Sequence, residues 1–68
     1  MVQIFGKDTC PYTQAARDHY ASRGIAVTYR NVKKDPAALT EMLALTRGRR
    51  DVPVIVEADE ITIGFGGT

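Results

Sequence analysis

The residue with the most specific chemistry in this chain is its single cysteine, Cys10. It stands in the string KDTCPYT, residues 7–13, between a short apolar run and a run typical of a helix. A thiol at a helix start lies near unpaired backbone N–H groups and the positive end of the helix dipole, and both favour the thiolate. We therefore expect Cys10 to be a nucleophile, at least partly exposed, with a pKa below the ~8.5 of a free cysteine. The alternative is an inert cysteine in the core.

Three neighbours of Cys10 bear on that chemistry. Lys7 could stabilise the thiolate or a bound carboxylate, or it could be a solvated loop lysine. Asp8 opposes ionisation of the thiol unless it points to solvent. The Thr13 hydroxyl could donate a hydrogen bond to the Cys10 sulfur or bond to its own backbone, and the sequence leaves both open.

Length and composition restrict the other possibilities. The 68 residues form one small domain, 1–68, with one cysteine, one histidine (His19) and a net charge of +1. An internal disulfide and a structural zinc site are therefore excluded, and a reducing, cytoplasmic location is indicated. The balanced charge does not favour nucleic-acid binding. No apolar stretch reaches the ~20 residues of a membrane span, and the first residues do not resemble a signal peptide.

The hydrophobic pattern predicts six elements that position the cysteine. Strands are expected over 2–5, 25–32, 52–56 and 61–63. One helix is expected from Pro11 to Ser22, and another from Pro36 to the stop at Gly48, with Asp35 as its N-cap. The first two strands should be parallel, with a right-handed crossover, and the last two should form a hairpin. The fold class is therefore α/β, with a four-stranded mixed sheet and two helices.

Three strings now show a resemblance that covers nearly the whole chain. KDTCPYT, DVP (residues 51–53) and GFGG (residues 64–67) resemble, in this order, the active-site loop, the proline loop and the glycine-rich segment of the glutaredoxin branch of the thioredoxin fold. The Gly64–Phe65 pair also resembles the small redoxins that serve ribonucleotide reductase. Some glutaredoxin-like relatives carry selenocysteine at the reactive position. Here Thr13 replaces the second cysteine, Asp51 stands where threonine is usual, and the chain stops before the family's last helix.

The resemblance implies a binding site around Cys10. It implies that Pro53 is cis and faces the thiol, that the Val52 backbone pairs with an extended peptide, and that Tyr12 flanks bound glutathione. The basic loop would then border the site, and Arg50, like Arg47 and Arg49, could grip a carboxylate or simply be solvated. Gly66 and Gly67 could offer N–H groups to an anion.

The leading hypothesis is a monothiol oxidoreductase. Cys10 accepts glutathione from a glutathionylated protein, and a second glutathione regenerates it, because Thr13 cannot resolve the mixed disulfide. Glutathione is a co-substrate, and neither a metal nor a tightly bound cofactor is expected. One alternative is a redoxin reduced by another thiol system and acting on disulfide-bearing proteins. Another is a non-catalytic carrier that holds an iron–sulfur cluster between two protomers.

The missing last helix gives a further expectation. If the second helix and the absent one share a face of the sheet, Ile55 or Ile63 is left uncovered. A second protomer would then cover the patch and give a homo-oligomer. The alternative is a monomer in which the Phe65 ring folds back over the gap.

Overall fold

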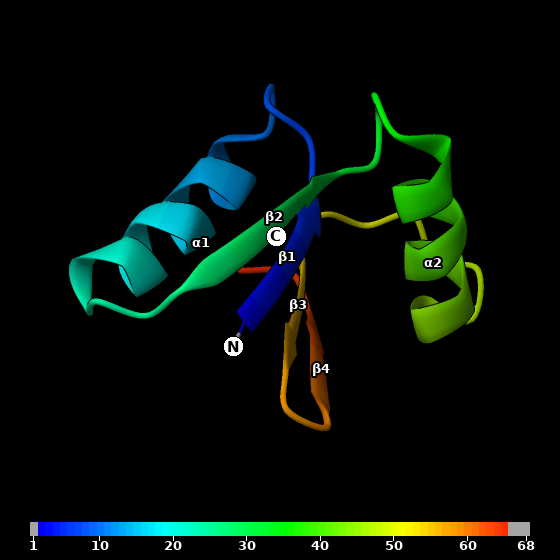
Figure 1. The fold of residues 1–68 in the computed structure, drawn as a ribbon. Helices are drawn as coiled ribbons and strands as arrows, with labels where there is room; N and C mark the ends of the chain where they lie inside the picture. Colours follow the sequence, from blue (N-terminus) through cyan, green and yellow to red (C-terminus); the bar gives the residue numbers. More distant parts are fainter. Residues whose placement is uncertain (1, 66–68) are drawn as a thin grey trace.

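A computed structural model describes residues 2–65 of the chain. The elements follow the predicted order, as Figure 1 shows: β1 (Val2–Gly6), α1 (Pro11–Ser22), β2 (Val27–Asn31), α2 (Pro36–Thr46), β3 (Val54–Glu57) and β4 (Glu60–Ile63). Both helices begin at prolines, and the Asp35 side chain caps α2 by accepting from the Ala37 N–H at 3.0 Å. The first residue of each helix is therefore determined by local features, a proline in both helices and an N-cap side chain in α2.

Two strands begin later than predicted. The N–H of Ile25 donates to the Tyr20 carbonyl at 3.1 Å, so this residue still belongs to the turn that ends α1. Pro53 has no N–H to give to a ladder, and pairing with β1 begins one residue later, with Val54 opposite Phe5. The start of β2 is thus set by the end of α1, and the start of β3 by a proline.

The sheet has the strand order β2-β1-β3-β4. β1 pairs in parallel with β2, and β3 pairs antiparallel with both β1 and β4, so the predicted hairpin and parallel pair are confirmed. Ile4 at the centre of β1 has Tyr29 and Ile55 as its neighbours on the two adjacent strands. The predicted four-stranded mixed sheet with two helices is therefore the observed fold.

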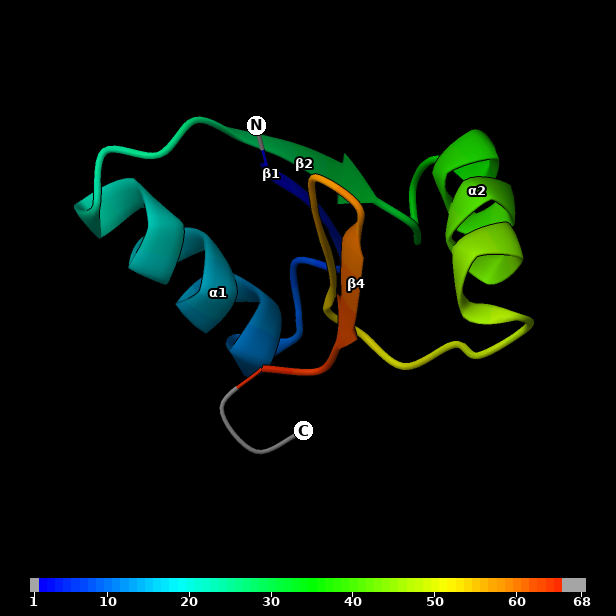
Figure 2. The same cartoon turned by 90° about the horizontal axis from the view of Figure 1, so that it is seen from below.

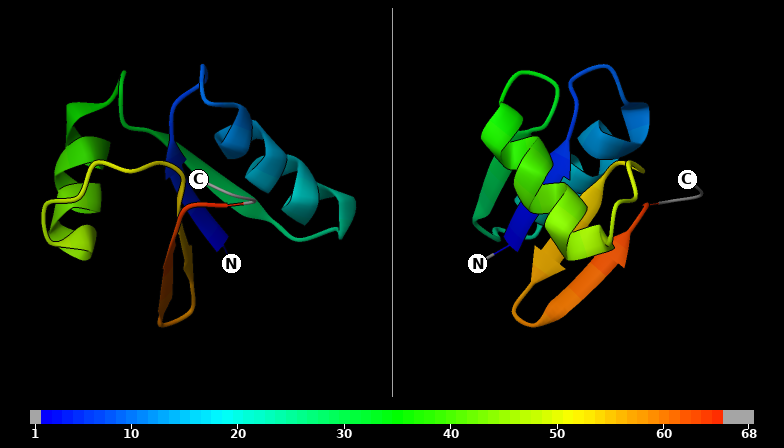
Figure 3. Two further views of the ribbon diagram at one scale, coloured as in Figure 1. Left: turned by 180° about the vertical axis from the view of Figure 1, so that it is seen from behind. Right: turned by 90° about the vertical axis from the view of Figure 1, so that its right-hand side faces the viewer.

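The two helices cover opposite faces of this sheet, as Figures 1 and 3 show. One buried cluster forms on the α1 face, from Val2, Ile4, Ala16 and Ile55. The other forms on the α2 face, from Phe5, Ala38, Met42 and Val54. Side chains alternate along a strand, so the consecutive residues Ile4 and Phe5 of β1 serve the two clusters.

The expectation that Ile55 is uncovered is wrong. Ile55 is only 3 % exposed, and it packs in the cluster beneath α1 rather than on the α2 face. Phe65 packs against the same cluster, and its ring lies 5.5 Å from the His19 ring. Figure 2 shows the chain after β4 turning toward α1. Ile63 is half-buried against the α2 cluster, whereas Phe65 packs on the opposite face of the sheet, against the α1 cluster. The association of two protomers stays a prediction.

Within residues 2–65, neither helix is long and apolar enough to cross a membrane. The same residues bring together no group of three or more side chains of the kinds that commonly hold a metal ion.

Candidate functional site around Cys10

Cys10 is the N-cap of α1, at the end of a tight turn that leaves β1. Its N–H donates to the Lys7 carbonyl at 3.2 Å, and its own carbonyl accepts from the N–H groups of Thr13 at 3.1 Å and Gln14 at 3.2 Å. Its backbone is extended, as Pro11 requires of the residue before it. The thiol therefore stands at the positive end of the α1 dipole.

The environment of Cys10 shifts its ionisation in the predicted direction. Burial on its own raises the pKa of the thiol. The Thr13 hydroxyl, the backbone N–H groups of Thr13 and Tyr12 and the charge of Lys7 act against it, and together they hold the pKa below its ordinary value. These groups all favour negative charge on sulfur, so the site is built to stabilise a thiolate.

Cys10 is more enclosed than predicted, with an exposed fraction of only 9 %. The carbonyl oxygen of Val52 lies 4.0 Å from the Cys10 Sγ, across 42 residues of sequence. Because this carbonyl faces the sulfur, a disulfide substrate can approach from fewer directions than it could at an open helix end.

Thr13 is buried, with 1 % of its surface exposed. Among residues 2–65 its Oγ1 has no hydrogen-bond partner, so the local backbone bond left open by the sequence is not formed. This leaves the hydroxyl available to the Cys10 sulfur, in agreement with its lowering effect on the Cys10 pKa. Thr13 fits here because Gly6 has no side chain: a Cβ at Gly6 would lie 2.4 Å from Thr13 Cγ2.

The loop from α2 to β3 brings Val52 to the thiol. The Val52–Pro53 bond is cis, as the resemblance predicted, and Pro53 is buried. The Pro53 carbonyl accepts from the Gly64 N–H at 2.7 Å, which ties the loop to the end of β4. At its other end, the Thr46 hydroxyl lies 2.8 Å from the Arg49 carbonyl. The loop is thus anchored on both sides of Val52.

A groove of about 380 Å³ opens beside this loop and runs toward α2. Its lining combines three cationic side chains with an apolar floor: Lys7, Val32, Lys33, Leu39, Met42, Arg50 and Val52. Three of these residues, Lys7, Arg50 and Val52, were predicted as site residues. Lys33 was missed, because a lysine at a strand end is typical of any solvated loop.

The other predicted site residues are placed differently. Tyr12 is 40 % exposed in the first turn of α1, next to Cys10 in sequence but outside the lining of the groove. Arg49 forms an ion pair with Asp51 at 2.9 Å, whereas Arg50 lines the groove. Gly66 and Gly67 lie outside the described residues.

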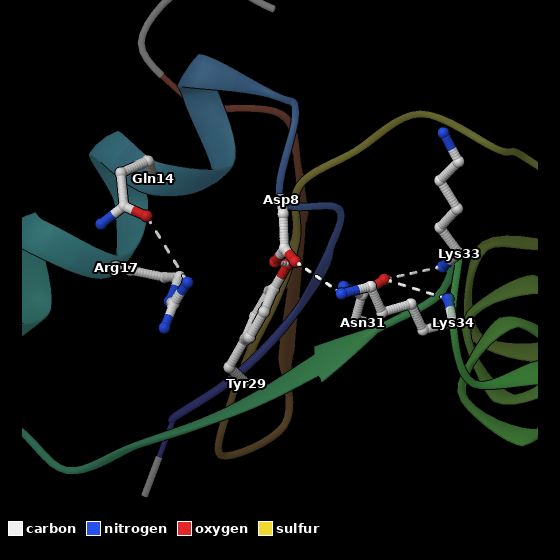
Figure 4. A network of polar contacts seen from close by, with 7 residues as sticks. All are labelled: Asp8, Gln14, Arg17, Tyr29, Asn31, Lys33 and Lys34. Atoms are coloured by element: carbon white, nitrogen blue, oxygen red, sulfur yellow. Dashed lines mark hydrogen bonds and ion pairs between the residues drawn. The ribbon is translucent and has the colours of Figure 1, made fainter.

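A polar network on the other side of the Cys10 turn was not predicted. Figure 4 shows the Tyr29 hydroxyl donating to Asp8 Oδ1, at 2.9 Å, while Lys34 Nζ lies 3.5 Å from Asp8 Oδ2. The hydrogen bond from Tyr29 is the main reason that the pKa of Asp8 is lowered. Burial, and after it this bond to Asp8, raise the pKa of Tyr29 to about 12. Tyr29 and Lys34 therefore bind the Asp8 carboxylate, and this reduces the repulsion expected between Asp8 and the thiolate.

Solved structures of the thioredoxin fold resemble this chain over nearly its whole length. NrdH-redoxin of Escherichia coli, a glutaredoxin-like protein with a thioredoxin-like activity profile, is 26 % identical with a TM-score of 0.82, over 96 % of this chain and 83 % of that one. The glutaredoxin grx-1 of Archaeoglobus fulgidus is 22 % identical with a TM-score of 0.78, over 96 % and 75 %. The thioredoxin-like protein BC3987 is 23 % identical with a TM-score of 0.87, over 97 % and 89 %. At their low sequence identities, the last two structures show only that the fold is shared.

A comparison with curated proteins gave no match. The sequence profile of the glutaredoxin family, in contrast, matches residues 2–61, which include Cys10, the cis proline and the three cations of the groove. The chain therefore belongs to the glutaredoxin family.

Proposed function

We propose that this protein is a thiol–disulfide oxidoreductase in which Cys10 is the only nucleophile. The observation that carries the proposal is the position of Cys10 at the start of α1, where hydrogen bonds and Lys7 lower its pKa. The chain has no second cysteine, so an external thiol completes the reaction. A free thiol of this kind is preserved in a reducing compartment, which favours a cytoplasmic location.

The reaction has two exchange steps. The Cys10 thiolate attacks the glutathione sulfur of a glutathionylated protein, a Cys10–glutathione disulfide forms, and the protein thiolate leaves and takes up a proton. A second glutathione, as thiolate, attacks the glutathione sulfur of that disulfide. Glutathione disulfide and the Cys10 thiolate are the products, so one free glutathione is consumed and the disulfide bond has passed from the protein to glutathione.

The groove supports glutathione as the co-substrate. Glutathione carries two carboxylates and a short peptide backbone, and the groove offers Lys7, Lys33 and Arg50 around an apolar floor. Cations and carboxylates form the stronger class of hydrogen bonds. We assign Arg50 and Lys7 to one carboxylate of glutathione, the Val52 backbone before Pro53 to its peptide groups, and Tyr12 to its exposed side. Backbone N–H groups at Gly66 and Gly67 remain a prediction for the second carboxylate.

The test is turnover of a small glutathione mixed disulfide, with glutathione and glutathione reductase present. Wild type is expected to turn over and to yield a Cys10–glutathione adduct in mass spectrometry when glutathione disulfide is added alone. Cys10→Ser is expected to do neither, since a hydroxyl is a poor nucleophile toward disulfides. An unmodified Cys10 after glutathione disulfide treatment would contradict the proposal.

A redoxin reduced by a different thiol system is the second candidate. The similarity to NrdH-redoxin, with its thioredoxin-like activity profile, favours it. The same assay separates the two when glutathione is replaced by a dithiol protein with its reductase: turnover only with that system would assign the second function. An iron–sulfur carrier would instead gain visible absorbance on anaerobic reconstitution with glutathione.

A further inference from the structure

Tyr29 contacts both segments that flank Cys10. Its hydroxyl donates to Asp8, two residues before the cysteine, and the Arg17 Cζ on α1 lies 4.0 Å from the centroid of its ring. Figure 4 shows Asp8 at the hydroxyl end of Tyr29 and Arg17 beside the Tyr29 side chain. Tyr29 itself is held in β2, where it pairs with Ile4 of β1. One side chain on a rigid strand thus joins the turn before the nucleophile to the helix after it.

The contact with Asp8 bears directly on the turn that presents the thiol. That turn is closed by a backbone bond from the Cys10 N–H to the Lys7 carbonyl, 3.2 Å long, and Asp8 is one of its two central residues. Lys34, from the segment after β2, holds the other carboxylate oxygen of Asp8. Both oxygens of Asp8 are therefore bound by residues outside the turn.

The electrostatic coupling of these groups agrees with the geometry. Asp8 and Cys10 both raise the pKa of Tyr29 in their charged forms, so the phenol lies within electrostatic reach of both. Like charges repel, so a carboxylate two residues from a thiolate disfavours it less when hydrogen bonds and ion pairs hold that carboxylate. Arg17 and Lys34, the charged neighbours from α1 and the β2–α2 segment, both lower the pKa of Asp8.

We propose that Tyr29 is a positioning residue for Cys10, because its hydroxyl holds Asp8 and its ring supports Arg17 on the two sides of the nucleophile. It touches no reacting atom. It keeps Cys10 aligned with the α1 N–H groups and Lys7, and it keeps the Asp8 carboxylate bound. The inference deepens the proposed oxidoreductase function and rests on it for its biological meaning, but it concerns a property of the thiol that can be measured separately.

The test is a double-mutant cycle between Tyr29→Phe and Asp8→Ala, measured by alkylation of Cys10 with iodoacetamide as a function of pH. Tyr29→Phe keeps the ring under Arg17 and removes only the hydroxyl. We expect its alkylation rate at neutral pH to fall by about three- to tenfold, with the midpoint of the rate profile moved to higher pH, as loss of one charge-assisted hydrogen bond permits. In the Asp8→Ala background, Tyr29→Phe should change neither quantity, because its partner is gone.

Two results would overturn the proposal. One is an unchanged rate and midpoint in Tyr29→Phe. The other is an equal effect with and without Asp8, which a merely structural role would give. If Tyr29→Phe does not fold, Lys34→Ala replaces it, since this side chain is 76 % exposed and removes the other partner of Asp8. It should slow alkylation by about twofold, and an unchanged rate would count against the proposal.

Alkylation needs no disulfide substrate, so the outcome is independent of the proposed function. A protein that alkylates as expected but exchanges no disulfide would contradict the oxidoreductase and leave the role of Tyr29 intact. If disulfide exchange is normal and the Tyr29→Phe variant alkylates like wild type, the role of Tyr29 is contradicted and the oxidoreductase function is left intact.

Discussion

The Cys10 sulfur and the Val52 carbonyl oxygen lie 4.0 Å apart, although 42 residues separate them in sequence. The contact joins the start of α1 to the loop that carries the cis Val52–Pro53 bond. A thiol proton can point at this carbonyl, whereas a thiolate has nothing to donate and is better served by the N–H groups of α1. The same sulfur thus has an acceptor on one side and donors on the other.

The first prediction concerns pH. Cys10 should alkylate with a midpoint below that of free cysteine, because hydrogen bonds and Lys7 lower its pKa. A group that ionises more readily in the folded state stabilises that state. The free energy of unfolding of wild type should therefore rise relative to Cys10→Ser as the pH increases from the pKa of Cys10 in the folded protein to the pKa of a free cysteine. It should lose this advantage as the pH falls through the folded pKa. Urea unfolding at several pH values checks the sign, and a constant difference would contradict it.

The second prediction separates stability from reactivity at Thr13. Thr13→Val keeps the branched shape and removes a buried hydroxyl that has no partner among residues 2–65. Stability should be unchanged or higher by about 1 kcal/mol. The pKa of Cys10 should rise, because a hydrogen-bond donor to the thiolate is lost. Denaturant midpoints and the alkylation profile measure the two effects. A lower denaturant midpoint with an unchanged alkylation profile would show that Thr13 is only a packing residue.

The third prediction also uses position 13. Thr13→Cys places a second thiol three residues after Cys10, a spacing that can close a disulfide at a helix start. The variant should oxidise reversibly with glutathione disulfide and turn over without an adduct that persists. Mass spectrometry under non-reducing conditions detects the loss of two hydrogen atoms. A variant that carries only glutathione adducts would show that positions 10 and 13 do not meet.

The fourth prediction tests the contact between β1 and α1 at Gly6. In Gly6→Ala the new Cβ would lie 2.4 Å from Thr13 Cγ2 and 2.6 Å from Thr13 Oγ1, so one of the two elements has to move. We expect a loss of about 1–3 kcal/mol in stability, as is usual for overpacking. Thr13→Ala removes both clashing atoms, so the double variant should recover part of that loss. If the stability losses of Gly6→Ala and Thr13→Ala simply add in the double variant, the strain does not come from the contact between positions 6 and 13.

Much of this fold follows from signals that act within a few residues. Pro11 and the Asp35–Pro36 pair start the helices at the predicted positions, since capping and the fixed φ of proline are local effects. The start of β3 was misplaced because sheet pairing needs an N–H that Pro53 lacks. Ile55 was assigned to the wrong face, because periodicity gives the alternation of a strand and not the helix that covers each side.

The candidate site was predictable in part for the same reason. Cys10 is recognisable from its own turn, and the cis Pro53 came from the resemblance to a family. The bond between Tyr29 and Asp8 depends on the register of β2 against β1, which pairs Tyr29 with Ile4. Nothing near Tyr29 in the chain specifies that register, so the pair becomes visible only when the strands are assembled.

The last prediction concerns the groove and the identity of the co-substrate. Arg50→Ala should raise the KM for glutathione by about two- to fivefold with little change in kcat, because an exposed cation contributes roughly 0.5–1 kcal/mol to binding a carboxylate. The increase should shrink at high salt, where the charge is screened. Arg23→Ala is the matched control: it removes the same charge at the far end of α1, at the helix C-cap and outside the groove lining. If the two variants have the same KM, the cationic groove does not hold glutathione. If the two KM values are the same and the protein still forms the Cys10 adduct, the protein fits a redoxin that receives its electrons from a protein dithiol.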